Sequence, residues 1–215
     1  MGRAKIKRGS TNVDMTAMCD VAFLLLSFFI LTTKFKPEEA IEVIPPSSVS
    51  SKAATDKDAF KVSINKDGQV FIDMSEEMRG DVIKELAKER NLTFTPEDVK
   101  YFEQATFVGG PISQLNQFDR LNSEQIKATK LSGIPVDSAN NELQAWISAA
   151  VQANLGTKIN FYIKGDNSSK FPAFKAVIDA FKKNDIYKYN LVTNAEDVPE
   201  GTELYRKNIL GEMGK

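Results

Sequence analysis

The sequence predicts an α+β protein with a single N-terminal transmembrane helix, a flexible linker and a small domain outside the membrane, whose helices pack on one face of a β-sheet. Three observations lead to this fold class. A mostly apolar run at 21–31 follows a basic stretch. Two segments that alternate with period two flank a turn at 65–68. A strand, a helix and a second strand follow one another between 158 and 193.

Composition limits the classes of function. The 215 residues carry a formal net charge of −1, and 27% of them are charged. This balance suits a water-exposed domain and argues against nucleic acid as the main partner. The chain has no histidine and one cysteine, Cys19, so we expect no metal site and no disulfide framework within one chain. Cys19 is interpreted as a small apolar residue of the membrane helix. Without histidine, a GxSxG motif or a Walker loop, we expect no enzyme and no cofactor.

The apolar run also fits a secretory signal peptide, whose apolar core has about 7–15 residues. Two features favour a retained anchor. Residues 32–36 contain no small-x-small cleavage site, and Asp20 interrupts the apolar character that a signal peptide needs. A helix over 15–33 is roughly 28 Å long at about 1.5 Å per residue, which just spans a hydrocarbon core of about 30 Å. We therefore expect a transmembrane helix at 14–34 after a tail at 1–13.

Basic residues on the two sides of this helix predict its orientation. Four precede it and two stand at or after its end: Arg3, Lys5, Lys7 and Arg8, then Lys34 and Lys36. Because Lys and Arg favour the cytoplasmic side, the N-terminus is expected in the cytoplasm. Everything after the helix then lies outside the cytoplasm, in the periplasm of a bacterium with two membranes.

Asp20 is the candidate functional residue. A charged residue in a membrane helix costs about 2.5–3.5 kcal/mol on insertion scales and persists where it faces protein or water. At about 100° per residue, one narrow polar stripe is formed by Thr16, Asp20, Ser27 and Lys34. A carboxylate is neutral when it is desolvated and ionises beside water, so Asp20 is expected to carry a proton. Thr16 is expected to donate a hydrogen bond to it, and Ser27 to hold a water molecule on the exit side.

Plainer interpretations of these residues stay open. Asp20 would then be an interfacial residue that snorkels to the cytoplasmic surface. The hydroxyls of Thr16 and Ser27 would bond to the helix backbone. Asp14 lies on the opposite side of the helix and is expected to cap its start.

The segment Val13–Thr33 resembles the membrane segment of the ExbD/TolR family, whose pattern is roughly Asn-x-Thr-Pro-x-x-Asp before an apolar run. Thr16 matches the threonine of the family and Asp20 matches its essential aspartate. Two positions depart from the pattern, because Asp14 stands in place of Asn and Ala17 in place of Pro.

The resemblance implies partners and an activity. Family members work as dimers inside a ring of ExbB/TolQ-type multi-span subunits, and proton flow past the aspartates drives relative rotation. For this chain it implies such a ring, a homodimer or a dimer with a paralogue, a TonB-like energy transducer and H⁺ as the transported ion. TonB-dependent uptake and a Tol-like process are both open. The alternative is a membrane-anchored periplasmic scaffolding or peptidoglycan-binding protein in which Asp20 serves only helix assembly.

Residues 35–58 are interpreted as an extended, mobile linker, because they contain prolines and the serine-rich run 47–51. Their one candidate for order is a strand at 40–44. A domain is expected at 59–195, with a C-terminal tail at 196–215. Its expected elements are strands 60–64 and 69–73 joined as a hairpin, strand 158–163, helix 171–183 and strand 187–193.

The segment at about 74–138 does not fit this pattern and is interpreted as a helix-rich insertion. It contains a predicted helix at 79–90, and Thr95 with Pro96 begins another as N-cap and first residue. A further helix at 140–155 holds Trp146, the only tryptophan. Both a surface elaboration and a docking site for a partner are open for this insertion.

Overall fold

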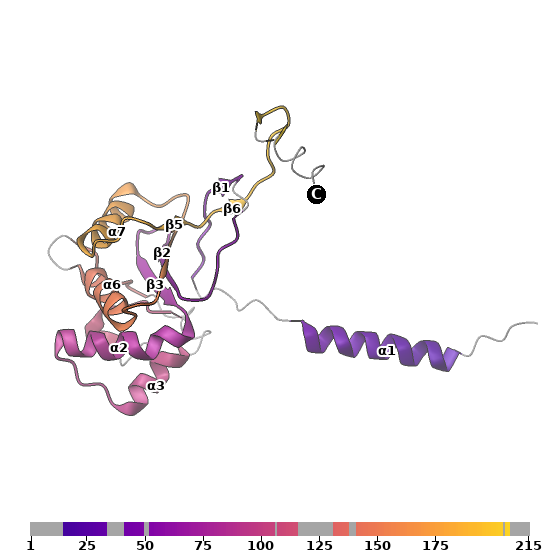
Figure 1. Cartoon of the computed structure of the whole chain (residues 1–215), viewed down its shortest axis with the longest axis horizontal. Coiled ribbons are helices and arrows are strands. Elements are labelled where there is room, and N and C mark those ends of the chain that lie inside the picture. Colours follow the sequence, from indigo (N-terminus) through magenta and orange to yellow (C-terminus); the bar gives the residue numbers. More distant parts are fainter. Residues whose placement is uncertain are drawn as a thin grey trace, which may run out of the picture. The chain divides into compact units, whose positions relative to one another are not determined.

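The computed structural model describes residues 15–33, 41–49, 52–105, 107–115, 131–137, 141–203 and 205–206. The chain divides into two units, 1–38 and 39–215, which are described separately (Figure 1). The predictions for Asp14, Lys34 and the basic N-terminal cluster concern residues outside the described ones.

The first unit contributes one described element, the helix α1 (Met15–Thr32). Its end agrees with the polar residues that follow the apolar run, and the N–H of Thr33 still donates to the carbonyl of Phe29 over 2.9 Å. The 18 residues have a mean hydropathy of 2.0, so α1 is long and apolar enough to cross a membrane.

The second unit is built on a four-stranded sheet in the order β3-β2-β4-β5. Its strands are β2 (Ala59–Ile64), β3 (Val70–Met74), β4 (Asn160–Gly165) and β5 (Asn190–Leu191). The predicted hairpin is confirmed, because β2 pairs antiparallel with β3 and Gly68 takes a φ of 80° in the turn. β4 lies parallel to both β2 and β5. The strand predicted at 187–193 is confirmed only for its two residues in β5.

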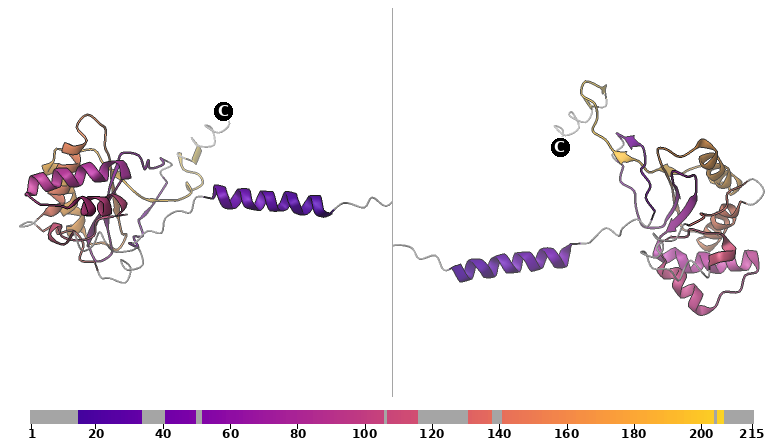
Figure 2. Two further views of the ribbon diagram at one scale, coloured as in Figure 1. Left: turned by 90° about the horizontal axis from the view of Figure 1, so that it is seen from below. Right: turned by 180° about the vertical axis from the view of Figure 1, so that it is seen from behind.

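Alternation along the strands separates the two faces of this sheet. Phe60, Val62 and Ile64 of β2 are fully buried and pair with core residues of β3. Helices cover this face (Figures 1 and 2). They are α2 (Glu76–Arg90), α3 (Pro96–Gln104), α6 (Glu142–Ala153) and α7 (Phe171–Lys183), and a short 3₁₀ turn lies at Ile112–Gln114. The α+β class with helices on one face is therefore confirmed, and α7 has the predicted bounds.

The described residues of the segment interpreted as an insertion contribute to the core, so for these residues the interpretation as a surface elaboration is wrong. α2 begins three residues before the predicted start and buries Val82, Ile83 and Leu86. Val108 exchanges backbone hydrogen bonds of 2.7 and 3.0 Å with Ile72 of β3. These bonds cover the edge of β3 that would otherwise expose unpaired groups.

α3 begins as the sequence predicts. The side chain of Thr95 accepts a hydrogen bond from the N–H of Asp98 over 3.2 Å, and the Asp98 carboxylate accepts from the N–H of Thr95 over 3.0 Å. This reciprocal pair is a capping box. The helix ends at Gln104.

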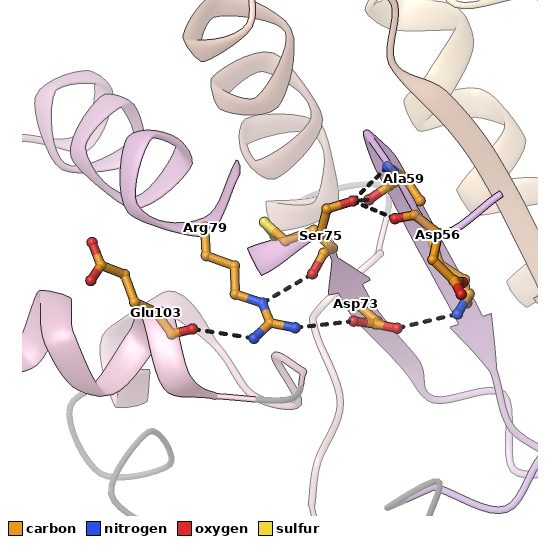
Figure 3. A network of polar contacts seen from close by, with 8 residues as sticks. Asp56, Ala59, Asp73, Ser75, Arg79 and Glu103 are labelled. Atoms are coloured by element: carbon orange, nitrogen blue, oxygen red, sulfur yellow. Dashed lines mark hydrogen bonds and ion pairs between the residues drawn. The ribbon is translucent and has the colours of Figure 1, made fainter. Parts of the chain in front are cut away.

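Arg79 joins α2, α3 and the end of β3 (Figure 3). Its guanidinium donates to the carbonyl of Met74 over 3.0 Å and to that of Glu103 over 3.2 Å. The same group lies 3.7 Å from the carboxylate of Asp73, which also pairs with Lys61 at 3.3 Å. The Arg79 side chain is 11% exposed, so water replaces these contacts poorly.

We expect Arg79→Met to lower the free energy of unfolding by about 1–3 kcal/mol, because the carbonyls of Met74 and Glu103 lose their donor at a site that is mostly shielded from water. Urea unfolding of the purified chain followed by circular dichroism measures this change. The matched control is Lys84→Met, whose partner Asp81 is 66% exposed; its loss should stay below about 1 kcal/mol. Equal losses of unfolding free energy in the two variants would show that the contacts of Arg79 with Met74 and Glu103 do not stabilise the domain.

Candidate functional site

The three stripe residues that the structure describes, Thr16, Asp20 and Ser27, all lie on the single helix α1. Spacings of four and seven residues along a continuous α-helix place them within an arc of roughly 40°. The structure therefore brings them to one side of the helix, and the roles expected of Thr16 and Asp20 stay predictions. Lys34, the fourth residue of the stripe, lies outside the described residues.

Ser27 shows the plainer of its two interpretations. Its hydroxyl donates to the carbonyl of Leu24 over 2.9 Å. The hydroxyl of Thr32 does the same to Phe28 over 2.8 Å. Such bonds satisfy the hydroxyl proton within the helix, while the oxygen lone pairs of Ser27 stay available as acceptors. Its expected role in holding water stays a prediction.

The remaining surface of α1 is apolar and has to be buried against lipid or protein. Large side chains around the helix are exposed within this unit, among them Phe23 at 67% and Leu31 at 85%. Lipid or protein must remove such a surface from water. The carboxylate of Asp20 needs a different neighbour, because its charge is costly against lipid. α1 therefore presents two kinds of surface, a broad apolar one and a narrow one that requires polar protein groups or water.

A second polar site lies where the predicted linker meets the domain. The predicted strand at 40–44 is wrong for its described residues, since 41–46 form no strand. Instead β1 (Ser47–Ser48) pairs in parallel with β6 (Asn194–Ala195). Main-chain N–H groups of Asn194 and Glu196 donate to carbonyls of this segment, each over 3.0 Å. The segment 41–49 is thus bound along the domain, contrary to the expectation of a mobile linker.

Asp166 holds the other part of this segment. One of its carboxylate oxygens accepts from the N–H of Ile44 over 2.9 Å, and the other accepts from the N–H of Ser168 over 2.8 Å. The N–H of Asn167 donates in turn to the carbonyl of Ile44 over 2.8 Å. The hydrogen bond from Ile44, followed by that from Ser168, lowers the pKa of Asp166 below its ordinary value of 3.8.

We expect Asp166→Ala to release the segment 41–49 at neutral pH. Amide hydrogen exchange at Ile44 and Asn167 should become several-fold faster, because the carboxylate that orients this main chain is removed. Exchange in the central strand β2 should not change. Asp67→Ala, which removes an exposed carboxylate in the hairpin turn, is the control and should leave both regions as they are.

The same contact has a defined pH dependence. A carboxylate whose pKa is lower in the folded chain stabilises that state at any pH above its unfolded pKa, and this contribution is lost as the pH falls through the folded pKa. The protection of the Ile44 amide, relative to an unstructured amide at the same pH, should therefore be lost in the wild type only below about pH 4. Release of the segment near neutral pH in the wild type would contradict the role of Asp166.

Sequence reasoning missed Asp166 as a binding residue. Its position, directly after a strand and before a helix, was visible in the sequence. Its partner Ile44 lies 122 positions earlier, in a segment whose prolines and serines indicate a linker. Among the residues described, no group of three or more His, Cys, Asp or Glu side chains that could hold a metal ion is present.

Comparison with known proteins gives two matches. A family model described as Biopolymer transport protein ExbD/TolR matches residues 7–196, a range that includes α1 and every strand of the domain. Biopolymer transport protein exbD2 of Vibrio cholerae serotype O1 is 32% identical over 73 residues, which cover 34% of this chain and 54% of that protein. The match thus spans about half the length of this relative. No solved structure matches the chain.

Proposed function

Because the chain belongs to the ExbD/TolR family of biopolymer transport proteins, we propose that it is the proton-carrying subunit of a motor in the inner membrane. The observation that carries this proposal is a carboxylate, Asp20, on the polar side of an otherwise apolar helix with a mean hydropathy of 2.0. Among the described residues, one helix that is long and apolar enough to cross a membrane lies near the N-terminus, which supports a single-pass membrane protein, and the family supports the inner membrane.

Asp20 works by alternating between two surroundings. In a dry setting among packed helices the neutral acid is favoured, and beside a water-filled path the ionised form is favoured. A carboxyl group that moves between these settings takes up a proton on one side and releases it on the other. Each elementary charge that crosses 100 mV releases about 2.3 kcal/mol, which is the energy that the motor can use. Thr16 lies one turn earlier, and its proposed role is to donate a hydrogen bond to the carboxylate.

The ion is H⁺. α1 offers one carboxylate and the hydroxyls of Thr16 and Ser27 on its polar side, and the Ser27 proton is bound to the backbone. A sodium site needs several oxygen ligands around one ion, whereas proton transfer needs a single titratable group.

The partners follow from the two surfaces of α1. The polar side requires neighbouring helices that offer polar groups or a water path, and an ExbB/TolQ-type ring of multi-span subunits supplies them. Two copies of α1, from this chain or from this chain and a paralogue, share that interior. A TonB-like transducer passes the force to an outer-membrane process. Support for these partners comes from the family and from the exposed stripe.

Asp20→Asn tests the proposal, because Asn keeps the size and the hydrogen-bonding capacity of Asp but cannot exchange a proton. Loss of energised transport with intact assembly supports the motor. A membrane-anchored scaffolding or peptidoglycan-binding protein would keep its function in this variant, since there Asp20 serves assembly alone.

A further inference from the structure

A cleft of about 340 Å³ opens between α6 and α7. None of its lining residues belongs to α1, the helix that carries Asp20. Its walls come from the start of α6 with its N-cap Asn141, from the middle and end of α7, and from Val136. The volume lies at the lower end of the range of small-ligand sites, about 300–1,000 Å³. The side-chain amide of Asn184 donates to the carbonyl of Gln144 over 3.3 Å and so fixes the end of α7 against α6. The cleft is therefore held between two packed helices.

Three charged side chains line this cleft without ion pairs among the described residues: Asp179, Lys182 and Lys183. The spacing of three and four residues on α7 would allow pairs on one helix face. On α2 the same spacing of three does produce them, since Lys84 pairs with Asp81 and Lys88 with Glu85. The carboxylate and the two ammonium groups in the cleft are thus available to a ligand.

Asn141 adds an unsatisfied acceptor to the lining of the cleft. Its side-chain oxygen Oδ1 is buried and has no hydrogen-bond partner. Buried polar atoms in native proteins nearly always have a partner, and no described residue supplies one to this oxygen. The amide of Gln144, also in the lining, offers both a donor and an acceptor.

We propose that this cleft binds a short peptide with a free terminal carboxylate and a free amino group. The ammonium groups of Lys182 and Lys183 bind the carboxylate. The carboxylate of Asp179 binds the ligand ammonium. A simple polyanion fits less well, because Asp179 repels it, and a cation meets two lysines. The mixture of charges therefore selects a zwitterion.

The test uses trialanine as the probe and the full chain in micelles of an uncharged detergent. Saturation-transfer-difference NMR of the peptide should show saturable binding in the millimolar range. Lys182→Ala with Lys183→Ala should weaken it by at least about tenfold, because both ammonium groups that bind the carboxylate are removed. Lys175→Ala, which removes an exposed lysine of α7 outside the cleft, is the matched control and should bind as the wild type does.

Blocked peptides identify the groups that are recognised. Trialanine amide, which lacks the carboxylate, should show no saturable binding. N-acetyltrialanine should bind more weakly than trialanine in the wild type, and Asp179→Asn should remove this difference. Equal binding of the amide and the free peptide, or equal binding by the double lysine variant and the wild type, would overturn the proposal. Because α1 takes no part in the site, Asp20→Asn should bind trialanine normally, which separates this result from the motor.

Discussion

Cells in which Asp20→Asn replaces the wild-type chain should lose energised transport almost completely. The variant side chain fits the same space and still accepts and donates hydrogen bonds, so helix packing is preserved. It has no titratable proton, so it cannot alternate between a neutral and an ionised form. The transmembrane potential then cannot act on this residue.

Two measurements separate this outcome from a failure of assembly. The multi-span partner should co-purify with the variant as well as with the wild type, while transport that depends on the proton motive force falls to the level of a deletion strain. The matched control is Asp14→Asn, the same change at the predicted helix cap, where Asn caps as well as Asp. Survival of both assembly and energised transport in Asp20→Asn would rule out the motor.

Phe102→Ala should give the largest loss of domain stability, about 3–5 kcal/mol. The ring is 2% exposed and stacks on Trp146 of α6, with ring centroids 5.7 Å apart and an interplanar angle of 16°. Removing it leaves a cavity between α3 and α6. Typical domains have only about 5–15 kcal/mol of stability in total, so a large share of it depends on a segment that the sequence suggested was an insertion.

Urea unfolding of the chain in micelles, followed by far-ultraviolet circular dichroism, measures this loss. Lys100→Ala is the control, because Lys100 lies on the same helix and is exposed. Its effect should stay within about 0.5 kcal/mol. A loss below about 1 kcal/mol for Phe102→Ala would show that α3 is only loosely attached to the domain.

Local patterns were sufficient to predict the elements that form through nearby contacts. The turn at 65–68 sets the register of the hairpin, and its Gly68 takes the positive φ that this turn needs. Helix α7 was predictable to the residue because its apolar positions repeat with helical spacing before a run of lysines. The polar side of α1 was also predictable, since it depends only on helical geometry.

Contacts between distant residues were not predictable in this way. Prolines and serines in 41–49 indicate a linker, yet the segment is ordered by Asp166 and by main-chain groups near Asn194. Nothing in its own composition encodes partners more than a hundred residues away. The length of the last strand was also not predictable from local sequence. β5 contains only the residues that pair with β4.

The segment 74–138 was interpreted as an insertion for a different reason, namely its polar average composition. Most of its charged side chains lie on the outer faces of α2 and α3, while a smaller apolar set, including Leu86 and Phe102, faces the core. Mean composition conceals such a division. The helix start at Thr95 was visible in the sequence. The packing of that helix against α6 was not.

Proton flux is the most direct measurement of the central claim, that Asp20 carries the proton. Vesicles that contain the chain with its multi-span partner, and a pH-sensitive dye inside, report flux when a potassium diffusion potential is imposed. The wild type should acidify the lumen, whereas Asp20→Asn should match vesicles that contain the partner alone. Flux in Asp20→Asn equal to that of the wild type would contradict the claim.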